Sequence, residues 1–214
     1  MSRSYSFSAA GGHPVNEDAF ILRQLPREEG WLVALADGQG GRAGGRRAAQ
    51  LACEVAIQRA LLLRPEQRAD GATWAEVLSL ADAAVATDRE AGLATLVGLC
   101  AGAGHVAGAS CGDSAAVAVC GDSAPRVLTS RQFKNPPVGS GEATFVPFEM
   151  ELTPPWRLLA ISDGVWKYAS WDRVWDCAAR LSGEELIEEL QQAARLKTSG
   201  EFPDDFTAVL LESE

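Results

Sequence analysis

Acidic residues stand where apolar segments end in five widely separated parts of this chain. These parts are Asn16-Glu17-Asp18, Asp37-Gly38-Gln39-Gly40-Gly41, Gly112-Asp113-Ser114, Ser162-Asp163-Gly164 and Asp204-Asp205-Phe206-Thr207. An apolar strand that stops at a carboxylate brings that carboxylate to a sheet edge, where several such groups can meet. Carboxylates gathered in this way repel one another and cannot all stay ionised. Divalent cations such as Mg²⁺ and Mn²⁺ prefer oxygen ligands and would hold them together. The pattern therefore favours a metal-dependent hydrolase.

Composition narrows the class of protein further. The chain has 214 residues, of which 47% are hydrophobic and 22% charged, as expected for one soluble globular domain. Its formal net charge of −10 argues against nucleic acid as a partner, because a phosphate backbone requires a basic surface. The longest apolar stretch, residues 93–104, is too short and too rich in glycine to span a membrane. No signal peptide is recognisable at the N-terminus, so we expect a cytoplasmic location.

The five cysteines do not predict a metal site or a disulfide framework. They are odd in number, widely spaced and contain no CxxC pair. We expect them to be small buried residues in a reducing compartment.

The order of expected elements predicts an α+β fold. Strands are expected at 4–10, 19–25, 31–36, 93–99, 105–110, 115–120, 126–129, 156–161 and 206–211. Helices are expected at 45–63, at 73–90 with Thr73 and Glu76 as a capping box, and at 171–181 and 184–196, the last of these capped by Ser182 and Glu185. Pro65 should stop the first helix, the segment 31–36 should be a central strand, and 130–141 should be an irregular loop. Strands, a helix pair, more strands and a second helix pair suggest a layered sandwich.

Each acidic motif also has a simpler structural interpretation. The segment from Gly38 to Ala43 spells G-x-G-x-x-A, which imitates a dinucleotide-binding fingerprint. Asp37 would then lie beside the pyrophosphate, and no second strand ending in an acidic residue follows at the expected distance. Asp37-Gly38 could otherwise be a plain turn, Asp163 could cap a helix, and Asp204 could belong to a solvated loop. The ordered occurrence of all five motifs is what favours a shared site.

Together the motifs resemble those of the metal-dependent serine/threonine protein phosphatases, the PPM family or type 2C. The matching segments are N-E-D-A at 16–19, A-D-G-x-G-G at 36–41, G-D-S at 112–114, S-D-G-V-W at 162–166 and D-D-F-T at 204–207. They cover nearly the whole chain. The resemblance implies a single domain, residues 1–214, with a four-layer αββα sandwich of two antiparallel sheets flanked by helix pairs. It also implies two Mn²⁺ or Mg²⁺ ions at one end of the sandwich.

The resemblance assigns roles to individual residues. Asp37 matches the aspartate that bridges both ions, and Gly38 the glycine that offers a carbonyl oxygen. Glu17 matches a ligand of one ion. The remaining matches are Asp163 and Asp204 as ligands of the other ion, Asp18 as a group that hydrogen-bonds water on the metal, and Asp113 as a ligand of a weaker third ion.

Four positions depart from the family pattern. His13 stands where an arginine usually holds the substrate phosphate, and an imidazole lacks the bidentate fork of a guanidinium. Gln39 stands where a histidine is often the proposed proton donor, and an amide does not titrate. Ala115 replaces an arginine that often follows Gly-Asp-Ser. Lys167 replaces an aspartate that often binds the third ion, so its ammonium could lie where that cation would, or it could simply be an exposed surface residue.

The spacing between Asp113 and Asp163 is short for the family and predicts a reduced flap at about residues 130–150.

The leading hypothesis is a metal-dependent phosphatase acting on phosphoserine and phosphothreonine, in which two ions activate the attacking water. Its expected partners are a phosphorylated protein and a kinase of the same pathway, and it is expected to be a monomer. The alternatives are a weakened or inactive phosphatase-like domain that binds phosphoproteins as a regulatory module, and an acidic interaction protein without metal.

Overall fold

The computed structural model describes residues 2–26, 30–39, 44–102 and 104–213. The described strands are β1 (Ser2–Ala9), β2 (Ala19–Gln24), β3 (Trp31–Ala36), β4 (Leu96–Gly102), β5 (His105–Cys111), β6 (Ala115–Cys120), β7 (Arg126–Val127), β8 (Val146–Glu151), β9 (Trp156–Ile161) and β10 (Phe206–Ser213). The described helices are α1 (Gly45–Leu61), α2 (Pro65–Arg68), α3 (Gly71–Thr87), α4 (Asp163–Ala169), α5 (Trp171–Arg180) and α6 (Gly183–Ala194).

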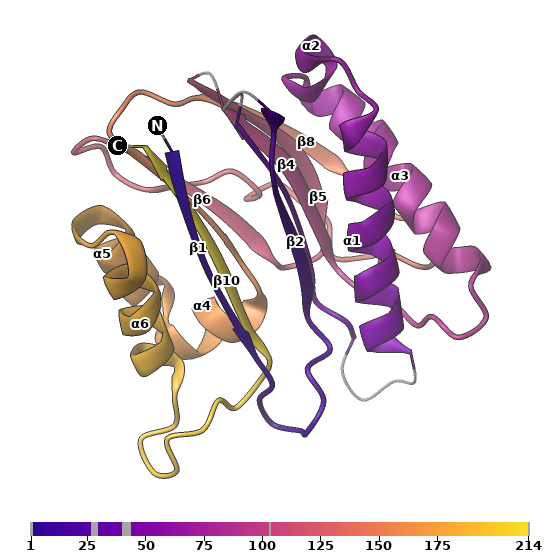
Figure 1. Cartoon of the computed structure of the whole chain (residues 1–214). Helices are drawn as coiled ribbons and strands as arrows, with labels where there is room; N and C mark the ends of the chain where they lie inside the picture. The colour runs from indigo at the N-terminus through magenta and orange to yellow at the C-terminus, as the bar shows by residue number, and fades with distance from the viewer. Residues whose placement is uncertain (1, 27–29, 40–43, 103, 214) are drawn as a thin grey trace.

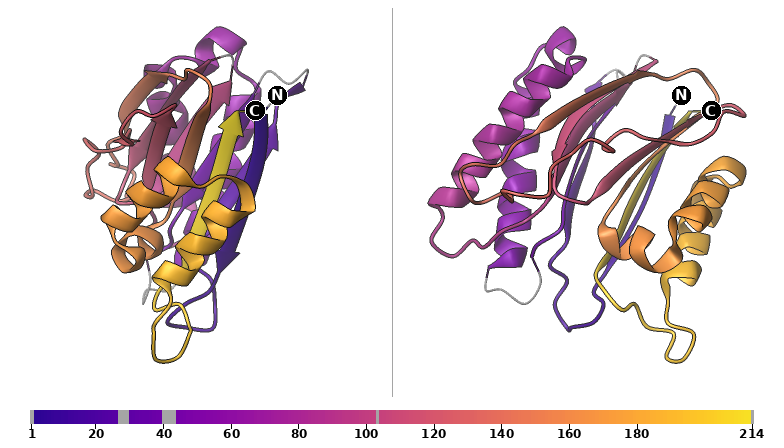
Figure 2. Two further views of the ribbon diagram at one scale, coloured as in Figure 1. Left: turned by 90° about the vertical axis from the view of Figure 1, so that its left-hand side faces the viewer. Right: turned by 180° about the vertical axis from the view of Figure 1, so that it is seen from behind.

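The strands form two five-stranded antiparallel sheets that pack face to face. Their orders are β1-β10-β9-β6-β7 and β2-β3-β4-β5-β8. Figure 1 shows α1 and α3 covering the outer face of one sheet and α4, α5 and α6 covering that of the other, and Figure 2 shows the same layers from behind. The predicted α+β sandwich of two antiparallel sheets between helices is confirmed.

The central strand β3 shows how the sequence produces these layers. Side chains alternate across a strand, so Leu32 and Ala34 pack against the layer of α1 and α3 while Val33 and Leu35 pack between the sheets. All four are at most 1% exposed. Full burial of one such aliphatic side chain stabilises the fold by about 1.5–3 kcal/mol. A strand that is apolar on both faces therefore belongs in the middle of a sandwich, as the sequence predicted.

Some predicted helix boundaries were wrong. The carboxylate of Asp70 accepts the backbone N–H of Thr73 at 2.7 Å, so Asp70 is the N-cap of α3 and Thr73 lies inside the helix. Ser182 is at the N-cap of α6, but its side chain makes no capping hydrogen bond. Pro65 does not simply stop α1, which already ends at Leu61, but begins the short helix α2, where a proline fits because no N–H is required.

Besides α2, two further elements were missed by the sequence analysis. Strand β8 lies inside the predicted flap region, and because it is at the edge of its sheet only Phe148 of its residues is buried, which leaves little apolar alternation to recognise. Helix α4 begins at Asp163 directly after β9, with Ser162 as its N-cap. The sequence analysis interpreted Asp163 as a metal ligand or as the cap of a helix, and predicted no helix at 163–169. The irregular part of the flap region is therefore limited to about residues 128–145.

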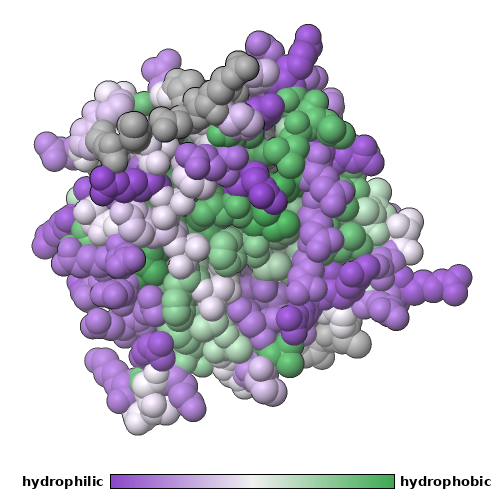
Figure 3. Space-filling model, viewed as in Figure 1, coloured by the Kyte–Doolittle hydropathy of each residue, from purple (hydrophilic) through white to green (hydrophobic). Residues whose placement is uncertain are grey.

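The surface of the sandwich is largely polar. Figure 3 shows hydrophilic side chains around the rim and a hydrophobic area in the middle of the view, between the two helical layers of Figure 1. Edge strands β1 and β2 lie in that direction, and most of their residues are half-buried. Among the helices of the described residues, none combines the length and the hydropathy needed to cross a bilayer.

Candidate metal centre

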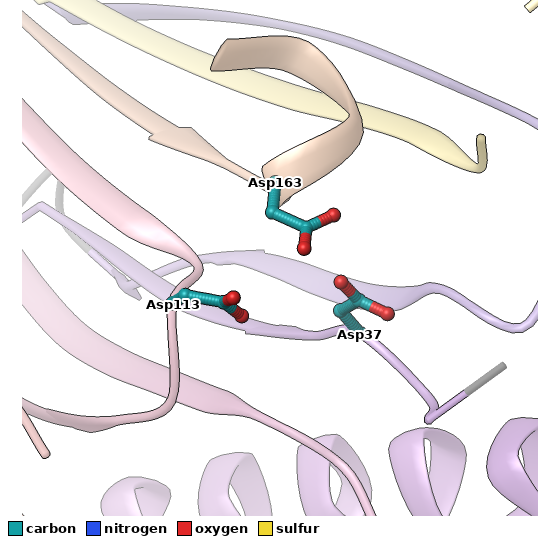
Figure 4. A group of neighbouring side chains, drawn as sticks. All are labelled: Asp37, Asp113 and Asp163. Atoms are coloured by element: carbon teal, nitrogen blue, oxygen red, sulfur yellow. The ribbon is translucent and has the colours of Figure 1, made fainter. Parts of the chain in front are cut away.

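Three of the predicted acidic residues meet at one end of the sandwich. Asp37 directly follows β3, Asp113 lies in the turn between β5 and β6, and Asp163 is the first residue of α4. One carboxylate oxygen from each lies within 4.8 Å of the others. Figure 4 shows the three side chains pointing toward a common centre from three separate elements. They meet because the antiparallel sheets bring the ends of β3, β5 and β9 to the same end of the molecule.

The backbone around Asp37 is fixed by Thr95, a residue for which the sequence analysis predicted no role. The N–H of Asp37 donates to Thr95 Oγ1 at 2.9 Å, and the N–H of Thr95 donates to the Asp37 carbonyl at 2.8 Å. Thr95 Oγ1 also lies 2.7 Å from Ser114 Oγ, which ties the Asp37 strand end to the Asp113 turn. Thr95 lies in no motif and is recognisable only from the register of β3 and β4.

Two motif glycines are required by close backbone contacts. A Cβ on Gly38 would lie 2.4 Å from the carbonyl carbon of Gly45, where α1 begins. A Cβ on Gly164 would lie 2.0 Å from the carbonyl oxygen of Asp205, where α4 crosses the start of β10. Both distances exclude a side chain. The glycines therefore let Asp37 and Asp163 approach each other from their two layers.

Asp37 has the strongest electrostatic perturbation of the cluster. Burial, followed by the charges of Asp18, Asp163, Asp113 and Asp204, raises the pKa of Asp37 to about 9. Each of these carboxylates disfavours ionisation of the others. A bound cation of charge +2 would remove this penalty, since opposite charge favours the ionised form.

Asp18 and Glu17 are held in place without satisfying their carboxylates. Asp18 is only 7% exposed, and burial raises its pKa to about 7, against the opposing effect of the nearby Thr207 and Ser162 hydroxyls. Even so, no group among the described residues gives either Asp18 carboxylate oxygen or Glu17 Oε2 a hydrogen bond of normal geometry. Burial also raises the pKa of Glu17. Buried carboxylate oxygens normally have partners, and their absence here fits oxygens that coordinate or approach a cation.

The two aspartates of the last motif have different roles. Asp204 lines the acidic cavity, and its charge raises the pKa of both Asp37 and Asp163. Asp205 faces the β1–β2 loop and accepts the backbone N–H groups of Gly11 at 2.9 Å and Glu17 at 2.6 Å. Asp205 therefore fixes the loop that carries Glu17, a function the sequence analysis did not predict.

His13 lies at the rim of the site. Its Nε2 is 3.8 Å from Asp205 Oδ2, and its side chain is 37% exposed. Gln39, at the other predicted substrate position, is exposed and also lines the cavity. Glycines 40 and 41 and Ala43 lie outside the described residues.

Strand β3 has antiparallel neighbours on both sides, so the parallel βαβ unit of a dinucleotide-binding fold does not form around Asp37.

Two lysines are bonded directly to the cluster. Lys167 Nζ donates to Asp163 Oδ2, four residues earlier on α4, and Lys134 Nζ donates to Asp113 Oδ2. The position of Lys167 agrees with its interpretation as a cation beside the acidic residues, although its side chain is 39% exposed. Lys134 was not predicted, because it belongs to no motif and reaches the site from the irregular loop.

These groups surround a cavity of about 440 Å³. Its lining consists of His13, Asp37, Gly38, Gln39, Ala94, Thr95, Gly112, Asp113, Lys134, Asn135, Pro137, Asp163, Lys167, Asp204 and Asp205. Of the predicted site residues, Glu17 and Asp18 are not in this lining. Asp18 faces a second cavity of about 400 Å³ shared with Ser8 and Gln50. The oxygen-only donor set and the unpartnered carboxylates suit a hard divalent cation.

Comparison with known proteins agrees with this geometry. A family model described as stage II sporulation protein E (SpoIIE) matches residues 27–214. No curated protein matches the chain at a significant level. The structure is similar to several bacterial phosphatases, and their sequence identities of about one fifth support a shared fold rather than a shared substrate.

Three solved structures illustrate the likeness. A bacterial serine phosphatase has a TM-score of 0.83 and 19% identity, covering 100% of this chain and 98% of its own. The serine/threonine phosphatase Stp1 from Staphylococcus aureus has a TM-score of 0.81 and 19% identity, with 100% and 96% covered. The catalytic domain of the phosphatase PstP, solved with two manganese ions, has a TM-score of 0.75 and 20% identity, with 99% and 97% covered.

Proposed function

Because the chain belongs to the SpoIIE family and has the fold of the PPM-type serine/threonine phosphatases, we propose that it is a metal-dependent phosphoprotein phosphatase. The substrate class would be phosphoserine and phosphothreonine side chains, hydrolysed as phosphomonoesters. The observation that carries the proposal is the meeting of Asp37, Asp113 and Asp163 within 4.8 Å beside buried carboxylates that lack partners.

The predicted ligands would hold two Mn²⁺ or Mg²⁺ ions. Asp37 would be shared, Asp163 and Asp204 would complete one set, and Glu17 with the Gly38 carbonyl the other. When bound, such ions lower the pKa of water and neutralise phosphoryl oxygens. The rest of the chain positions the ligands: Thr95 fixes Asp37, Gly164 brings α4 to β10, and Asp205 fixes the backbone of Glu17.

The groups that face the substrate would bind phosphate weakly. His13 is exposed and offers at most one charged hydrogen bond at a time, where an arginine would offer two in parallel. Loss of a charged hydrogen bond costs about 1.5–3 kcal/mol. Asp18, whose charge acts on Asp37, would accept a hydrogen bond from water inside the site. Gln39 at the cavity wall can orient a leaving group or water but cannot protonate it.

Hydrolysis of p-nitrophenyl phosphate and of a phosphoserine peptide by the purified protein tests the proposal. Both reactions should require Mn²⁺ or Mg²⁺ and stop when the metal is chelated. Mn²⁺ at a hundred times its dissociation constant should also stabilise the fold by about 2.7 kcal/mol per site. An acidic interaction protein without metal would show neither hydrolysis nor stabilisation.

The role of Gln39 can be tested by adding the missing acid. The Gln39→His variant should hydrolyse the phosphoserine peptide faster, by up to about 100-fold, because a general acid assists a poor alkoxide leaving group. It should change p-nitrophenyl phosphate hydrolysis little, since that leaving group needs no proton. If the ratio of the variant rate to the wild-type rate is the same on both substrates, this role for position 39 is refuted.

A second candidate function is a regulatory module that binds phosphoproteins without hydrolysing them. It is favoured by the simultaneous absence of the usual groups at His13, Gln39 and Ala115, the last of which is only 2% exposed. Retention of the mutually repelling carboxylates argues for the enzyme. Metal binding with tight retention of a phosphopeptide and no phosphate release would support the module instead.

Four further expectations remain predictions: a phosphoprotein partner, a kinase of the same pathway as a second partner, a monomeric state and a cytoplasmic location.

A further inference from the structure

The acidic cluster contains two cations supplied by the chain itself. Lys167 is bonded to Asp163 and Lys134 to Asp113, so two of the three clustered aspartates already carry an ammonium group. We propose that Lys134 and Lys167 take the place of a third divalent ion and limit the centre to two. This inference rests on the proposed function and specifies its metal content.

The placement of Lys167 follows from helix geometry. Residues four apart lie on the same face of a helix, and Asp163 and Lys167 are the first and fifth residues of α4. The helix is also attached to the Asp113 turn, because Trp166 Nε1 donates to the Asp113 carbonyl at 3.0 Å. Trp166 also stacks on Trp171, with ring centroids 5.4 Å apart. The ammonium of Lys167 is therefore held beside Asp163, and the charges of Asp163, Asp113 and Asp204 act on it.

Lys134 reaches the cluster from a loop that is fixed at two points. Next to it, the carbonyl of Phe133 accepts the backbone N–H of Gly112 at 2.8 Å, which places Lys134 beside the Asp113 turn. Farther along, Asp82 on α3 accepts the N–H groups of Gly139 at 2.6 Å and Ala143 at 3.1 Å. The loop that carries Lys134 is thus held in place on both sides of this residue, at Phe133 and at Gly139.

Both lysines bind the oxygens that an additional ion would need. The three aspartates carry three negative charges when ionised, and the two ammonium groups offset two of them. A third divalent ion at Asp113 and Asp163 would have to displace a cation that is tethered to the same molecule and therefore present at high effective concentration. Of the two ions that would share Asp37, one would also use Asp204 and the Asp163 oxygen that Lys167 does not bind, and the other would use Glu17, so neither requires that displacement.

The two lysines should contribute unequally. The side chain of Lys134 is 67% exposed, so water and salt screen its ion pair. Lys167 is 39% exposed and pairs with an aspartate whose side chain is 11% exposed. We therefore expect Lys167 to be the main barrier to a third ion and Lys134 to be secondary.

The test is the number of Mn²⁺ ions bound per folded chain, measured by equilibrium dialysis with metal analysis at saturating metal. The wild type should bind two. Lys167→Asp should bind three, because it removes the ammonium and adds a carboxylate. Lys167→Arg should bind two, because it keeps the positive charge. Lys197→Asp is the matched control, since it makes the same charge change at an exposed position away from the cavity and should leave the number at two.

Each other result has a defined meaning. Three ions in the wild type would overturn the inference while leaving the proposed phosphatase intact. No bound ion in the wild type would overturn the metal-dependent function itself, and the inference with it. If Lys167→Asp does not fold by circular dichroism, Lys167→Met provides the test, because it removes the ammonium without adding a charge. A folded Lys167→Asp or Lys167→Met chain that still binds only two ions would contradict the inference.

Discussion

Asp37 and Asp82 are both largely removed from solvent but have opposite surroundings. Asp82, on α3, is 3% exposed, and its carboxylate accepts three backbone N–H groups, from Gly139 at 2.6 Å, Gly141 at 3.2 Å and Ala143 at 3.1 Å. Among the described residues, none donates a hydrogen bond to the Asp37 carboxylate. Burial, with the charges of neighbouring carboxylates, raises its pKa to about 9.

The difference separates an acid with a structural role, Asp82, from a candidate metal ligand, Asp37. The carboxylate of Asp82 accepts hydrogen bonds from the chain itself, and these bonds anchor the loop that carries Lys134. The ionised form of Asp37 is unfavourable in the protein without metal. The same surroundings favour that form once a cation is bound. An acidic residue that the fold leaves without donors is therefore a better candidate ligand than an equally buried one with a complete set.

The largest expected effect is on turnover. Asp37→Asn should reduce Mn²⁺-dependent hydrolysis of p-nitrophenyl phosphate by at least about 1,000-fold, because loss of the shared ligand removes several kcal/mol of transition-state stabilisation. The variant should stay folded, and without metal it should be at least as stable as the wild type, because folding no longer requires a buried carboxyl group to take up a proton. Steady-state kinetics and thermal unfolding check both. Near wild-type turnover in Asp37→Asn would refute the metal site.

The convergence of Asp37, Asp113 and Asp163 could be predicted because each follows or opens a regular element at a motif. Antiparallel strands return to the same end of a sheet, so motifs at those ends are brought together without knowledge of the full topology. The central position of β3 was predictable for a similar reason, since its apolar residues have the period of a strand buried on both faces.

The contacts that complete the site could not be predicted. Thr95, Asp82 and Lys134 act on partners 58, 57 to 61 and 21 residues away, respectively, and no local pattern marks any of them. Their roles depend on strand register and on the path of an irregular loop. Asp204 and Asp205 were named together in their motif and both line the cavity, but only the structure shows that Asp205 also accepts the backbone N–H groups of Gly11 and Glu17.

The second prediction concerns Asp82, where substitution should lower stability and leave metal binding intact, the opposite of the result expected for Asp37→Asn. Asp82→Asn should lower the free energy of unfolding by about 1.5–3 kcal/mol, because three backbone donors lose a charged acceptor. Mn²⁺ binding should persist, since Asp82 is not in the cavity lining. Urea unfolding with Mn²⁺ titration measures both quantities. Glu76→Gln, an exposed site on the same helix, is the matched control and should cost less than about 0.5 kcal/mol. Equal losses in the two variants would contradict the anchoring role of Asp82.

The third prediction concerns the pH dependence of the metal-free protein. The folded-state pKa values of Asp18 and Asp37 are raised to about 7 and about 9, whereas an unfolded aspartate titrates near 3.9. Between about pH 4 and pH 9 the folded chain therefore binds more protons than the unfolded chain, so its stability falls as the pH rises through this window. The slope is at most about 1.4 kcal/mol per pH unit for each proton involved.

Thermal unfolding from pH 5 to pH 9, in chelator and in saturating Mn²⁺, separates the two kinds of acid. In chelator the melting temperature should fall as the pH rises. Asp37→Asn should flatten the alkaline part of that curve, because only Asp37 still titrates there, whereas Asp82→Asn should shift the whole curve down without changing its slope. Saturating Mn²⁺ should reverse the trend, since a cation binds the ionised carboxylates and protons compete with it. A metal-free curve that rises with pH would mean that Asp37 and Asp18 find donors in solution, and the contrast with Asp82 would then disappear.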